Sequence, residues 1–284
     1  MSKGIFSDIL LTVDYDRTLT APDSTIPTQN IEAIRYFMEN GGAFTINTGR
    51  SLPMAQVILD NVPVNAPLLL YNGSATYDTV SGKLCAYQEI QLDFWKTINT
   101  CISLLPDLFI EVQGMDAHYC FPDNSMWHAF CEQQLCAHKT ANYGEDLGPF
   151  LKFAVYGQFR DVTVSHMFSG SVSECAAIDR AEKVLRKEFG DYLEIHRSAP
   201  RYLDLHAKGT SKARSARELQ AQLRRKILIC VGDGVNDLSM MEEADYSYAP
   251  SDGAIAPLFD TVCNCADGSI ADVIFRKIPN ICAK

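Results

Sequence analysis

Short apolar runs of strand length alternate with amphipathic helical patterns in the first third of the chain and again in its last quarter. Runs rich in β-favouring residues predict strands, and apolar residues spaced three and four positions apart predict helices. The predicted strands are residues 9–13, 43–47, 67–71, 226–231 and 245–250, and the predicted helices are 28–40, 51–61, 211–223, 238–243 and 270–275. Such alternation predicts an α/β fold, a parallel sheet covered by helices on both faces.

The pattern changes between residues 82 and 206, where strands are expected in consecutive pairs. The predicted strands are residues 83–90, a pair within 108–121, 151–159, 162–168, 192–196 and 202–205, and the predicted helices are 92–105, 125–136 and 173–189. Consecutive strands are typical of an antiparallel sheet in an α+β unit. We therefore expect a Rossmann-like parallel core of residues 1–81 and 207–284 with an inserted α+β domain at 82–206.

Composition and charge narrow the possible partners. The 284 residues are 47% hydrophobic and 21% charged, which suits a globular protein with a sizeable core. The formal charge of -10 argues against a nucleic-acid partner, because neutralising phosphates requires clustered lysine and arginine. A small anionic substrate needs only local positive charge. No apolar run approaches the roughly 18 residues of a membrane span, so we expect no membrane partner.

The N-terminus has no pattern of a secretory signal, which predicts a cytoplasmic protein. The ten cysteines are then expected to be reduced and mostly buried, because a chain of this length does not depend on a disulfide framework. Nothing in the sequence indicates an oligomeric state.

Acidic residues stand directly after two of the predicted parallel strands. Asp14 and Asp16 follow the first strand, Asp233 and Asp237 follow the most apolar strand, and Thr48 follows a third. Ligands bind beyond the carboxyl ends of parallel strands, so we expect these side chains at one rim of the sheet. Converging carboxylates repel one another unless a cation compensates them, and an oxygen-rich site of this kind favours Mg²⁺.

Three basic residues, Arg50, Lys208 and Lys212, are the nearest sources of positive charge in the predicted fold. A metal ion and a lysine beside aspartates suit phosphoryl transfer, because the cations neutralise charge on the transferred group while a carboxylate can act as the nucleophile. The sequence therefore predicts phosphoryl-transfer chemistry at the strand tips.

These residues carry a resemblance to a known family. The segments Asp14-Tyr15-Asp16-Arg17-Thr18, Thr48-Gly49-Arg50, Lys212 and Gly232-Asp233-Gly234-Val235-Asn236-Asp237 are similar to the four motifs of the haloacid dehalogenase superfamily, in its order and spacing. The long insertion resembles the cap domain of the Cof-type sugar-phosphatase branch. The pair Asn72-Gly73 and the segment Lys208-Gly209-Thr210-Ser211-Lys212 also resemble that branch.

The resemblance implies a role for each motif residue. It makes Asp14 the nucleophile that forms an aspartyl phosphate, and Asp16 the residue that protonates the leaving oxygen and then deprotonates the attacking water. It implies a Mg²⁺ site formed by Asp14, Asp16, Asp233 and Asp237, in which Asp16 contributes its backbone carbonyl and Asp237 binds directly or through water. It implies a phosphate site formed by Thr48, Gly49, Lys212 and Asn236.

The resulting prediction is a Mg²⁺-dependent phosphatase of a small phosphorylated metabolite, with a sugar phosphate or similar polyol phosphate as the expected class. A phosphomutase of the same fold is one alternative, and a non-catalytic phosphate-binding protein is another. Lys208 competes with Lys212 for the lysine role, and the resemblance favours Lys212. Arg50 is open between packing, substrate and phosphate. The candidate specificity residues in the inserted domain are Tyr119, Trp127, His128, Tyr156 and His166.

One residue departs from the family pattern. Arg17 stands where the family usually has glycine, directly after the predicted acid/base residue. If the backbone there has φ > 0, arginine is strained, whereas a negative φ directs its side chain either outward or into the cleft. Arg17 therefore bears on the rate and on substrate choice more than on the class of reaction.

Overall fold

A computed structural model describes residues 4–157 and 172–282. The predicted strand 162–168 and the candidate His166 lie outside these residues. The chain forms two compact units. The core unit contains Met1–Gly49, Ile58–Ala86 and Ser211–Lys284, and the inserted unit contains Arg50–Val57 and Tyr87–Thr210.

The core unit is organised around a five-stranded sheet in the order β13-β12-β11-β1-β2, and every neighbouring pair is parallel. The strands are β1 (Ile9–Val13), β2 (Ala43–Ile46), β11 (Ile227–Val231), β12 (Tyr246–Pro250) and β13 (Asp260–Val262). The predicted α/β fold with a parallel core sheet is confirmed. The edge strand β13 was not predicted, because its three residues are too few to carry a periodic pattern.

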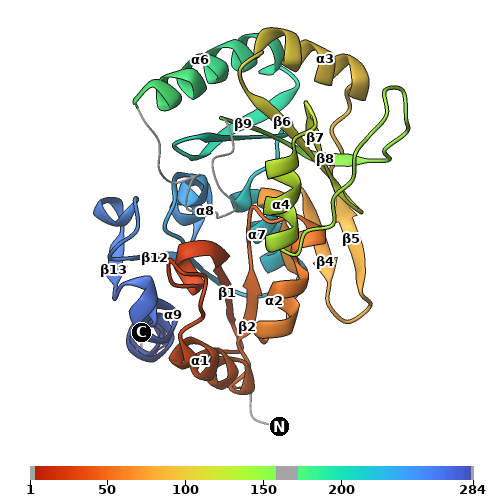
Figure 1. The fold of residues 1–284 in the computed structure, drawn as a ribbon. Helices are drawn as coiled ribbons and strands as arrows, with labels where there is room; N and C mark the ends of the chain where they lie inside the picture. Colours follow the sequence, from red (N-terminus) through yellow and green to blue (C-terminus); the bar gives the residue numbers. More distant parts are fainter. Residues whose placement is uncertain (1–3, 158–171, 283–284) are drawn as a thin grey trace. The chain divides into compact units, whose positions relative to one another are not determined.

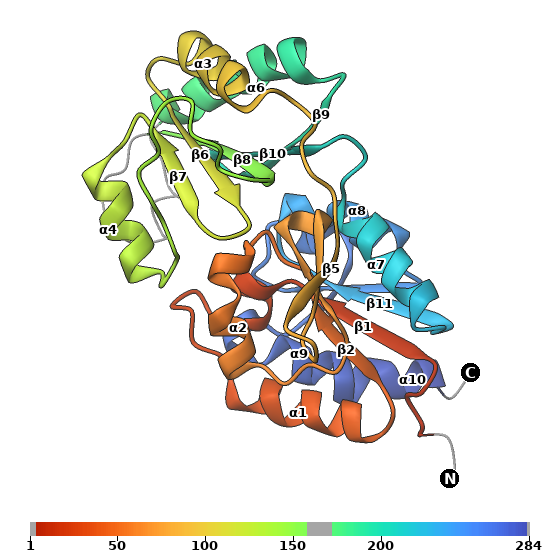
Figure 2. The ribbon, with the colours of Figure 1, turned by 90° about the vertical axis from the view of Figure 1, so that its right-hand side faces the viewer.

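Helices cover both faces of this sheet, as Figure 2 shows. One face carries α1 (Thr28–Glu39), α9 (Ser269–Asp272) and α10 (Ile278–Cys282), and the other carries α7 (Lys212–Gln222) and α8 (Leu238–Glu243). Alternate strand residues point to opposite faces, so Leu10 and Leu228 pack with Ala216 of α7 and Met240 of α8 in one buried cluster. The short helical turns of the core unit are η1 (Tyr15–Leu19), η3 (Tyr71–Gly73), η4 (Val235–Asp237), η5 (Ala256–Leu258), η6 (Cys265–Asp267) and η7 (Val273–Lys277).

The predicted strand 67–71 joins the parallel sheet only weakly. It is β3 (Leu68–Leu70), which meets the end of β2 through one parallel bridge between Asn47 and Leu69. Its main partner is antiparallel β4 (Ala75–Asp78), in a separate sheet with the order β3-β4-β5. The strand predicted at 83–90 is β5 (Lys83–Tyr87), which lies beside β4, and the core unit accordingly extends to Ala86.

The inserted unit is an antiparallel sheet with helices, ordered β7-β6-β8-β10-β9. Its strands are β6 (Phe109–Gly114), β7 (His118–Phe121), β8 (Phe150–Tyr156), β9 (Leu193–Ala199) and β10 (Tyr202–Ala207). The prediction of an inserted α+β domain is confirmed at this level. Figure 1 labels its helices α3 (Phe94–Leu104), α4 (Ser125–Gln133) and α6 (Val172–Phe189), which are preceded along the chain by η2 (Leu52–Met54) and α2 (Gln56–Asn61).

The two faces of the inserted sheet differ in chemistry. One face is apolar, where Ile110 and Phe153 pack against Ile98 of α3 and Leu185 of α6. The opposite face buries Trp127 of α4 in a smaller cluster. The same face also buries polar and charged side chains at alternate strand positions: Glu111, Gln113, His118, Lys152, Asp204 and His206.

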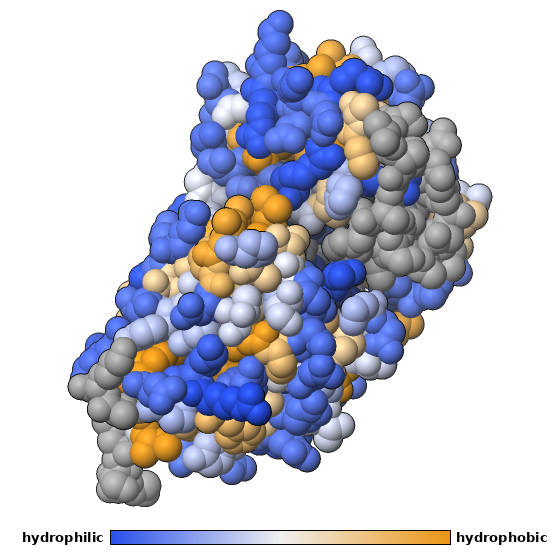
Figure 3. Space-filling view, turned by 90° about the vertical axis from the view of Figure 1, so that its left-hand side faces the viewer, coloured by the Kyte–Doolittle hydropathy of each residue, from blue (hydrophilic) through white to orange (hydrophobic). Residues whose placement is uncertain are grey.

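The surface of the chain is mostly polar on the face drawn in Figure 3, where hydrophobic residues form only scattered patches. Among the described residues, no helix combines the length and the apolar character needed to cross a membrane. All ten cysteines are free thiols and six of them are buried.

Candidate active site

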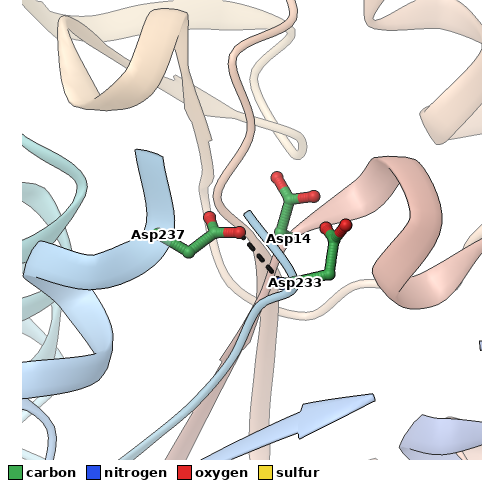
Figure 4. Close-up of side chains that lie close together, drawn as sticks. All are labelled: Asp14, Asp233 and Asp237. Carbon is green, nitrogen blue, oxygen red and sulfur yellow. Dashed lines mark hydrogen bonds between the residues drawn. The ribbon is translucent and has the colours of Figure 1, made fainter. Parts of the chain in front are cut away.

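The three aspartates at the tips of β1 and β11 converge. Asp14 follows β1 directly, and its backbone N–H donates to the carbonyl of Val231 at the end of β11 (2.9 Å). Because β1 and β11 are parallel neighbours, the loops that follow them meet at one rim. Asp14, Asp233 and Asp237 each place a carboxylate oxygen within 4.8 Å of the others (Figure 4).

The loop after β11 is shaped around the Asp237 carboxylate. The backbone N–H groups of Asp233 (3.1 Å) and Gly234 (3.0 Å) both donate to Asp237 Oδ2, and Figure 4 draws the first of these bonds. A Cβ at Gly232 would lie 2.5 Å from the Asp237 Cβ, so only glycine allows this close approach. The glycine-rich sequence of the loop therefore fixes the orientation of the second acidic side chain.

Lys212 supplies the positive charge. It is the first residue of α7, whose N-cap Ser211 accepts from the N–H of Arg214 (3.1 Å). Its ammonium is fully buried and donates to Asp14 Oδ1 and to Asp237 Oδ1, both at 2.6 Å. Burial alone lowers the pKa of a lysine, but Asp14 and Asp237 outweigh burial and raise the pKa of Lys212, so it is charged at every physiological pH.

Negative charge exceeds positive charge at this rim. Burial raises the pKa of Asp14 well above its ordinary value, and the charges of Asp237, Asp233 and Asp16 add to this effect while Lys212 opposes it. Burial, followed by the charge of Asp237, raises the pKa of Asp233 to about 7. Carboxylates that resist ionisation in the absence of a further cation are a typical signature of a functional site.

The donor set fits a hard divalent cation. The converging atoms are all carboxylate oxygens, which are the ligands that Mg²⁺ prefers, and the Lys212 ammonium offsets only part of their charge. Asp14, Asp233 and Asp237 are together the residues that could hold such an ion. The carboxylate of Asp16 is not a member of the converging group among the described residues.

Asp16 and Arg17 occupy the turn η1, directly after Asp14. Asp16 has an extended backbone and is close enough to raise the pKa of the Asp14 carboxyl. Arg17 has φ = 62°, the left-handed conformation, so arginine stands at a position that favours glycine. The positive charge of Arg17 lowers the pKa of Asp233, which places this side chain near the acidic rim.

Thr18 is a residue of the site for which the sequence offered no role. Its hydroxyl donates to Asp233 Oδ1 (2.9 Å), and its carbonyl accepts from the Ser269 hydroxyl of α9 (2.7 Å). Thr18 is fully buried, and its hydroxyl therefore holds the Asp233 carboxylate in a fixed orientation. The signal was its place as the last residue of the first motif.

The predicted phosphate residues after β2 are linked through Asn72. Its backbone N–H donates to the carbonyl of Thr48 (2.9 Å), and its Oδ1 accepts from Asn236 Nδ2 (3.4 Å). A Cβ at Gly49 would lie 3.0 Å from the same Asn72 oxygen. Asn72 thus joins Thr48, Gly49 and Asn236, and the signal for it was the Asn72-Gly73 pair at a strand tip, which was quoted without a role.

The two candidate lysines have different surroundings. Lys208 donates to the carbonyl of Gly190 (2.9 Å) and lies 3.4 Å from Glu194, and all three residues belong to the inserted unit. Lys212 contacts the aspartates. Arg50 is buried and is also grouped with the inserted unit.

A family model described as haloacid dehalogenase-like hydrolase matches residues 11–255 of the chain, which span both units and every residue of the site described above. The chain belongs to this family. The family resemblance inferred from the four motifs is thereby confirmed.

Among curated relatives, the chain is similar to two proteins of Bacillus subtilis, each named as a 5-amino-6-(5-phospho-D-ribitylamino)uracil phosphatase. It is 22% identical to YcsE over 84% of this chain and 82% of the relative. It is 25% identical to YwtE over 84% of this chain and 86% of the relative.

Solved structures share the fold over nearly the full length of the chain. A haloacid dehalogenase-like hydrolase from Bacteroides thetaiotaomicron has a TM-score of 0.77 at 20% identity, covering 94% of this chain and 98% of that one. A structure titled as a HAD subclass IIB sugar phosphatase has a TM-score of 0.74 at 17% identity, covering 96% of this chain and 99% of that one. At these identities the likeness is one of fold.

Proposed function

We propose that this chain is a Mg²⁺-dependent phosphatase that hydrolyses a small phosphorylated metabolite through an aspartyl phosphate on Asp14. One observation carries the proposal: the buried Lys212 ammonium bridges Asp14 and Asp237 at 2.6 Å, while the Asp233 carboxylate converges on the same place, so that three carboxylates share one ammonium. A dianionic phosphoryl group can approach a carboxylate nucleophile only where cations offset the negative charge of both, which Lys212 does in part and a divalent ion would complete.

The first step forms a bond between a carboxylate oxygen of Asp14 and phosphorus and breaks the bond between phosphorus and the leaving oxygen. Lys212 holds Oδ1 of Asp14, so we assign the attack to Oδ2. We assign to Asp16 the proton that the leaving oxygen receives. The products are a free alcohol and a phosphorylated Asp14.

The second step returns the enzyme to its starting state. Asp16, now ionised, accepts a proton from water, whose oxygen forms a bond to phosphorus as the Asp14–phosphorus bond breaks. Inorganic phosphate leaves, and Asp14 is again a carboxylate. Splitting the displacement in this way replaces one difficult step by two easier ones.

The remaining residues bind and orient. We assign Thr48, the Gly49 backbone, Asn236 and Lys212 to the phosphoryl oxygens, with Asn72 holding the first three in register. We assign the metal to Asp14, Asp233, the Asp16 carbonyl and Asp237, the last of these directly or through water. When bound, Mg²⁺ supplies electrostatic stabilisation of the phosphoryl group.

We infer that the substrate is a phosphate ester of a sugar or polyol. The support is the chemistry named for the relatives: the Bacillus proteins act on a phosphorylated ribityl chain, and one structure of the same fold is named as a sugar phosphatase. The residues after β1, β2 and β11 are committed to phosphate, metal and proton transfer, so other residues must select the alcohol part of the substrate.

Release of inorganic phosphate from para-nitrophenyl phosphate and from a panel of sugar and polyol phosphates tests the proposal, with and without Mg²⁺. We expect metal-dependent turnover that falls at least about a thousandfold in Asp14→Asn, because the amide is not a nucleophile. Turnover that persists in Asp14→Asn would contradict it. Formation of an isomeric sugar phosphate in place of inorganic phosphate would instead show a phosphomutase.

A further inference from the structure

A second cluster of reactive side chains is buried in the inserted unit, where α4 ends. Cys131 lies in the last turn of α4, and Cys136 follows the helix. Both thiols are buried in the small cluster around Trp127, and both are free. The proposed phosphatase chemistry assigns no role to either of them.

The end of α4 brings the two thiols together. Cys136 N–H donates to the carbonyl of Cys131 (2.9 Å), and Leu135 N–H donates to the carbonyl of Glu132 (3.1 Å). Leu135 has φ = 52°, the left-handed conformation. These features define a Schellman motif, in which the side chains at the positions of Cys131 and Cys136 pack against each other. The Cys131 thiol is accordingly a hydrogen-bond partner of the Cys136 sulfur.

His118 completes the cluster from β7. Its backbone N–H donates to the carbonyl of Ala137 (2.9 Å), next to Cys136. Its Nδ1 is paired with the Glu111 carboxylate, and its Nε2 lies 2.6 Å from the Ser51 hydroxyl. His118 is also a hydrogen-bond partner of Cys136, so its imidazole has three polar partners, Glu111, Ser51 and Cys136.

The charges in the cluster favour a thiolate. Burial alone would lower the pKa of His118, but the Glu111 charge and hydrogen bonds to Cys136 and Glu111 raise that pKa to about 9. The hydrogen bond from Cys131, followed by that from His118, lowers the pKa of Cys136 to about 6 against the opposing effect of burial. The same hydrogen bond to Cys136, followed by burial, raises the pKa of Cys131, which therefore remains a thiol. A thiolate beside an imidazolium and a second thiol is the arrangement of reactive cysteines.

We propose that Cys131 and Cys136 form a redox-active thiol pair, in which Cys136 is the attacking sulfur and a peroxide is the oxidant. The cluster lies just beneath the surface, because Leu135 at the turn is 79% exposed. Because Cys131 and Cys136 are themselves buried, the smallest peroxide, hydrogen peroxide, is the oxidant of this proposal.

The reaction balances without any further reagent. The Cys136 sulfur forms a bond to one peroxide oxygen, the O–O bond breaks, and the departing hydroxide takes a proton from His118 to become water. The Cys131 sulfur then attacks the Cys136 sulfenic acid, the S–S bond forms, the S–O bond breaks, and the hydroxide leaves with the Cys131 proton as a second water. The thiols lose two electrons, and one peroxide becomes two waters.

Peptide mapping of the full chain after hydrogen peroxide tests this proposal. The reduced protein is treated, quenched with catalase, unfolded and alkylated. We expect Cys131 and Cys136 to lose alkylation together, with a fragment lighter by two hydrogens, before the exposed Cys85 and Cys282 react. In Cys131→Ser, a sulfenic acid on Cys136 should be trapped by dimedone.

Substitution of His118 distinguishes an activated thiol pair from two thiols that merely lie close together. At pH 7, His118→Asn should slow the reaction of Cys136 about tenfold, because the thiolate fraction falls toward that of an ordinary cysteine. His128→Asn, on α4 with Cys131, is the matched control and should keep the wild-type rate. Glu111→Gln is a second test should His118→Asn fold poorly. Oxidation of Cys85 and Cys282 while Cys131 and Cys136 stay reduced would overturn the proposal, as would a wild-type rate in both His118→Asn and Glu111→Gln.

Discussion

At the scale of single residues, the site depends on a buried lysine that is outnumbered by acids. Lys212 is fully buried between Asp14 and Asp237, and Asp233 completes the group. Removing one partner of a buried ion pair leaves the other charge uncompensated, which costs more than removing the same residue from the surface. Lys212 therefore serves stability and the proposed chemistry together.

Lys212→Met tests whether Lys212, and not Lys208, is the lysine of the site. We expect it to lower the free energy of unfolding by about 3 kcal/mol, because two buried carboxylates lose their cation, and to lower phosphate release at least about a hundredfold. The matched control is Lys208→Met, because Lys208 is exposed. This variant should change the free energy of unfolding by less than about 0.5 kcal/mol. Equal effects of the two substitutions, measured by urea denaturation, would refute the assignment.

Arg17 is the second residue with a specific expectation. Its φ of 62° is costly for a side chain that has a Cβ, so Arg17→Gly should raise the free energy of unfolding by about 0.5–1 kcal/mol. The charge of Arg17 lowers the pKa of Asp233, so its loss should also move the acid limb of metal binding to higher pH. Urea denaturation and Mg²⁺ titration at several pH values measure both effects. If kinetics are unchanged across substrates, the side chain plays no part in substrate choice.

At the scale of elements, the parallel sheet and one helix start deliver the site. β1 and β11 end at the same level, with Val13 paired to Val231, and α7 begins at Lys212. The position of the ammonium therefore depends on how well α7 is started. Ser211 is its N-cap.

Ser211→Ala tests this dependence. Loss of the bond from Arg214 N–H should lower the free energy of unfolding by about 1 kcal/mol and reduce phosphate release severalfold, because the first turn of α7 frays. Asp93→Ala removes the equivalent N-cap of α3 in the inserted unit. It should cost similar stability and leave phosphate release unchanged. A Ser211→Ala enzyme that is destabilised but fully active would show that Lys212 is held by its aspartates alone.

The acidic residues at the strand tips could be predicted because their sequence signals are local. An apolar run that ends in acids identifies Asp14 and Asp233 without knowledge of the fold, and parallel pairing then brings them together. Thr18 and Asn72 were missed as site residues because their roles are hydrogen bonds to partners far away in sequence, Asp233 and Asn236. No periodicity or composition encodes such partners.

In the fold, too, features with a local sequence pattern were predicted and features without one were not. The core sheet and the inserted antiparallel sheet follow from hydrophobic periodicity and were predicted, whereas β13 and β4 are short and were not. The sequence also could not reveal that residues 83–86 belong to the core unit. They pair with β4, and β4 was itself not predicted.

At the scale of the whole molecule, the acidic rim couples stability to pH. Asp233 ionises at about pH 7 in the folded chain but near 3.9, about the ordinary pKa of aspartate, when unfolded. Between these values the folded chain holds a proton that the unfolded chain has released, so the stability of the metal-free protein should fall as pH rises through this window. Thermal unfolding in a chelator at several pH values measures the slope.

Two controls make this pH dependence specific. Asp233→Asn should flatten the slope, because the titrating group is gone. Mg²⁺ should raise the unfolding temperature of the wild type more at pH 8 than at pH 5, because ligand binds the ionised rim and stabilises the folded state by mass action. A wild-type slope in Asp233→Asn would mean that other groups dominate the titration.

The most direct measurement is chemical trapping of the phosphorylated enzyme. Protein is mixed with a turned-over substrate and Mg²⁺, quenched in acid and reduced with borohydride, which converts an aspartyl phosphate to homoserine; peptide mass spectrometry then locates the change. We predict homoserine at position 14 and at no other aspartate, and none without substrate. Steady turnover without any trapped residue, or trapping at Asp16, Asp233 or Asp237, would contradict the assignment of Asp14 as the nucleophile.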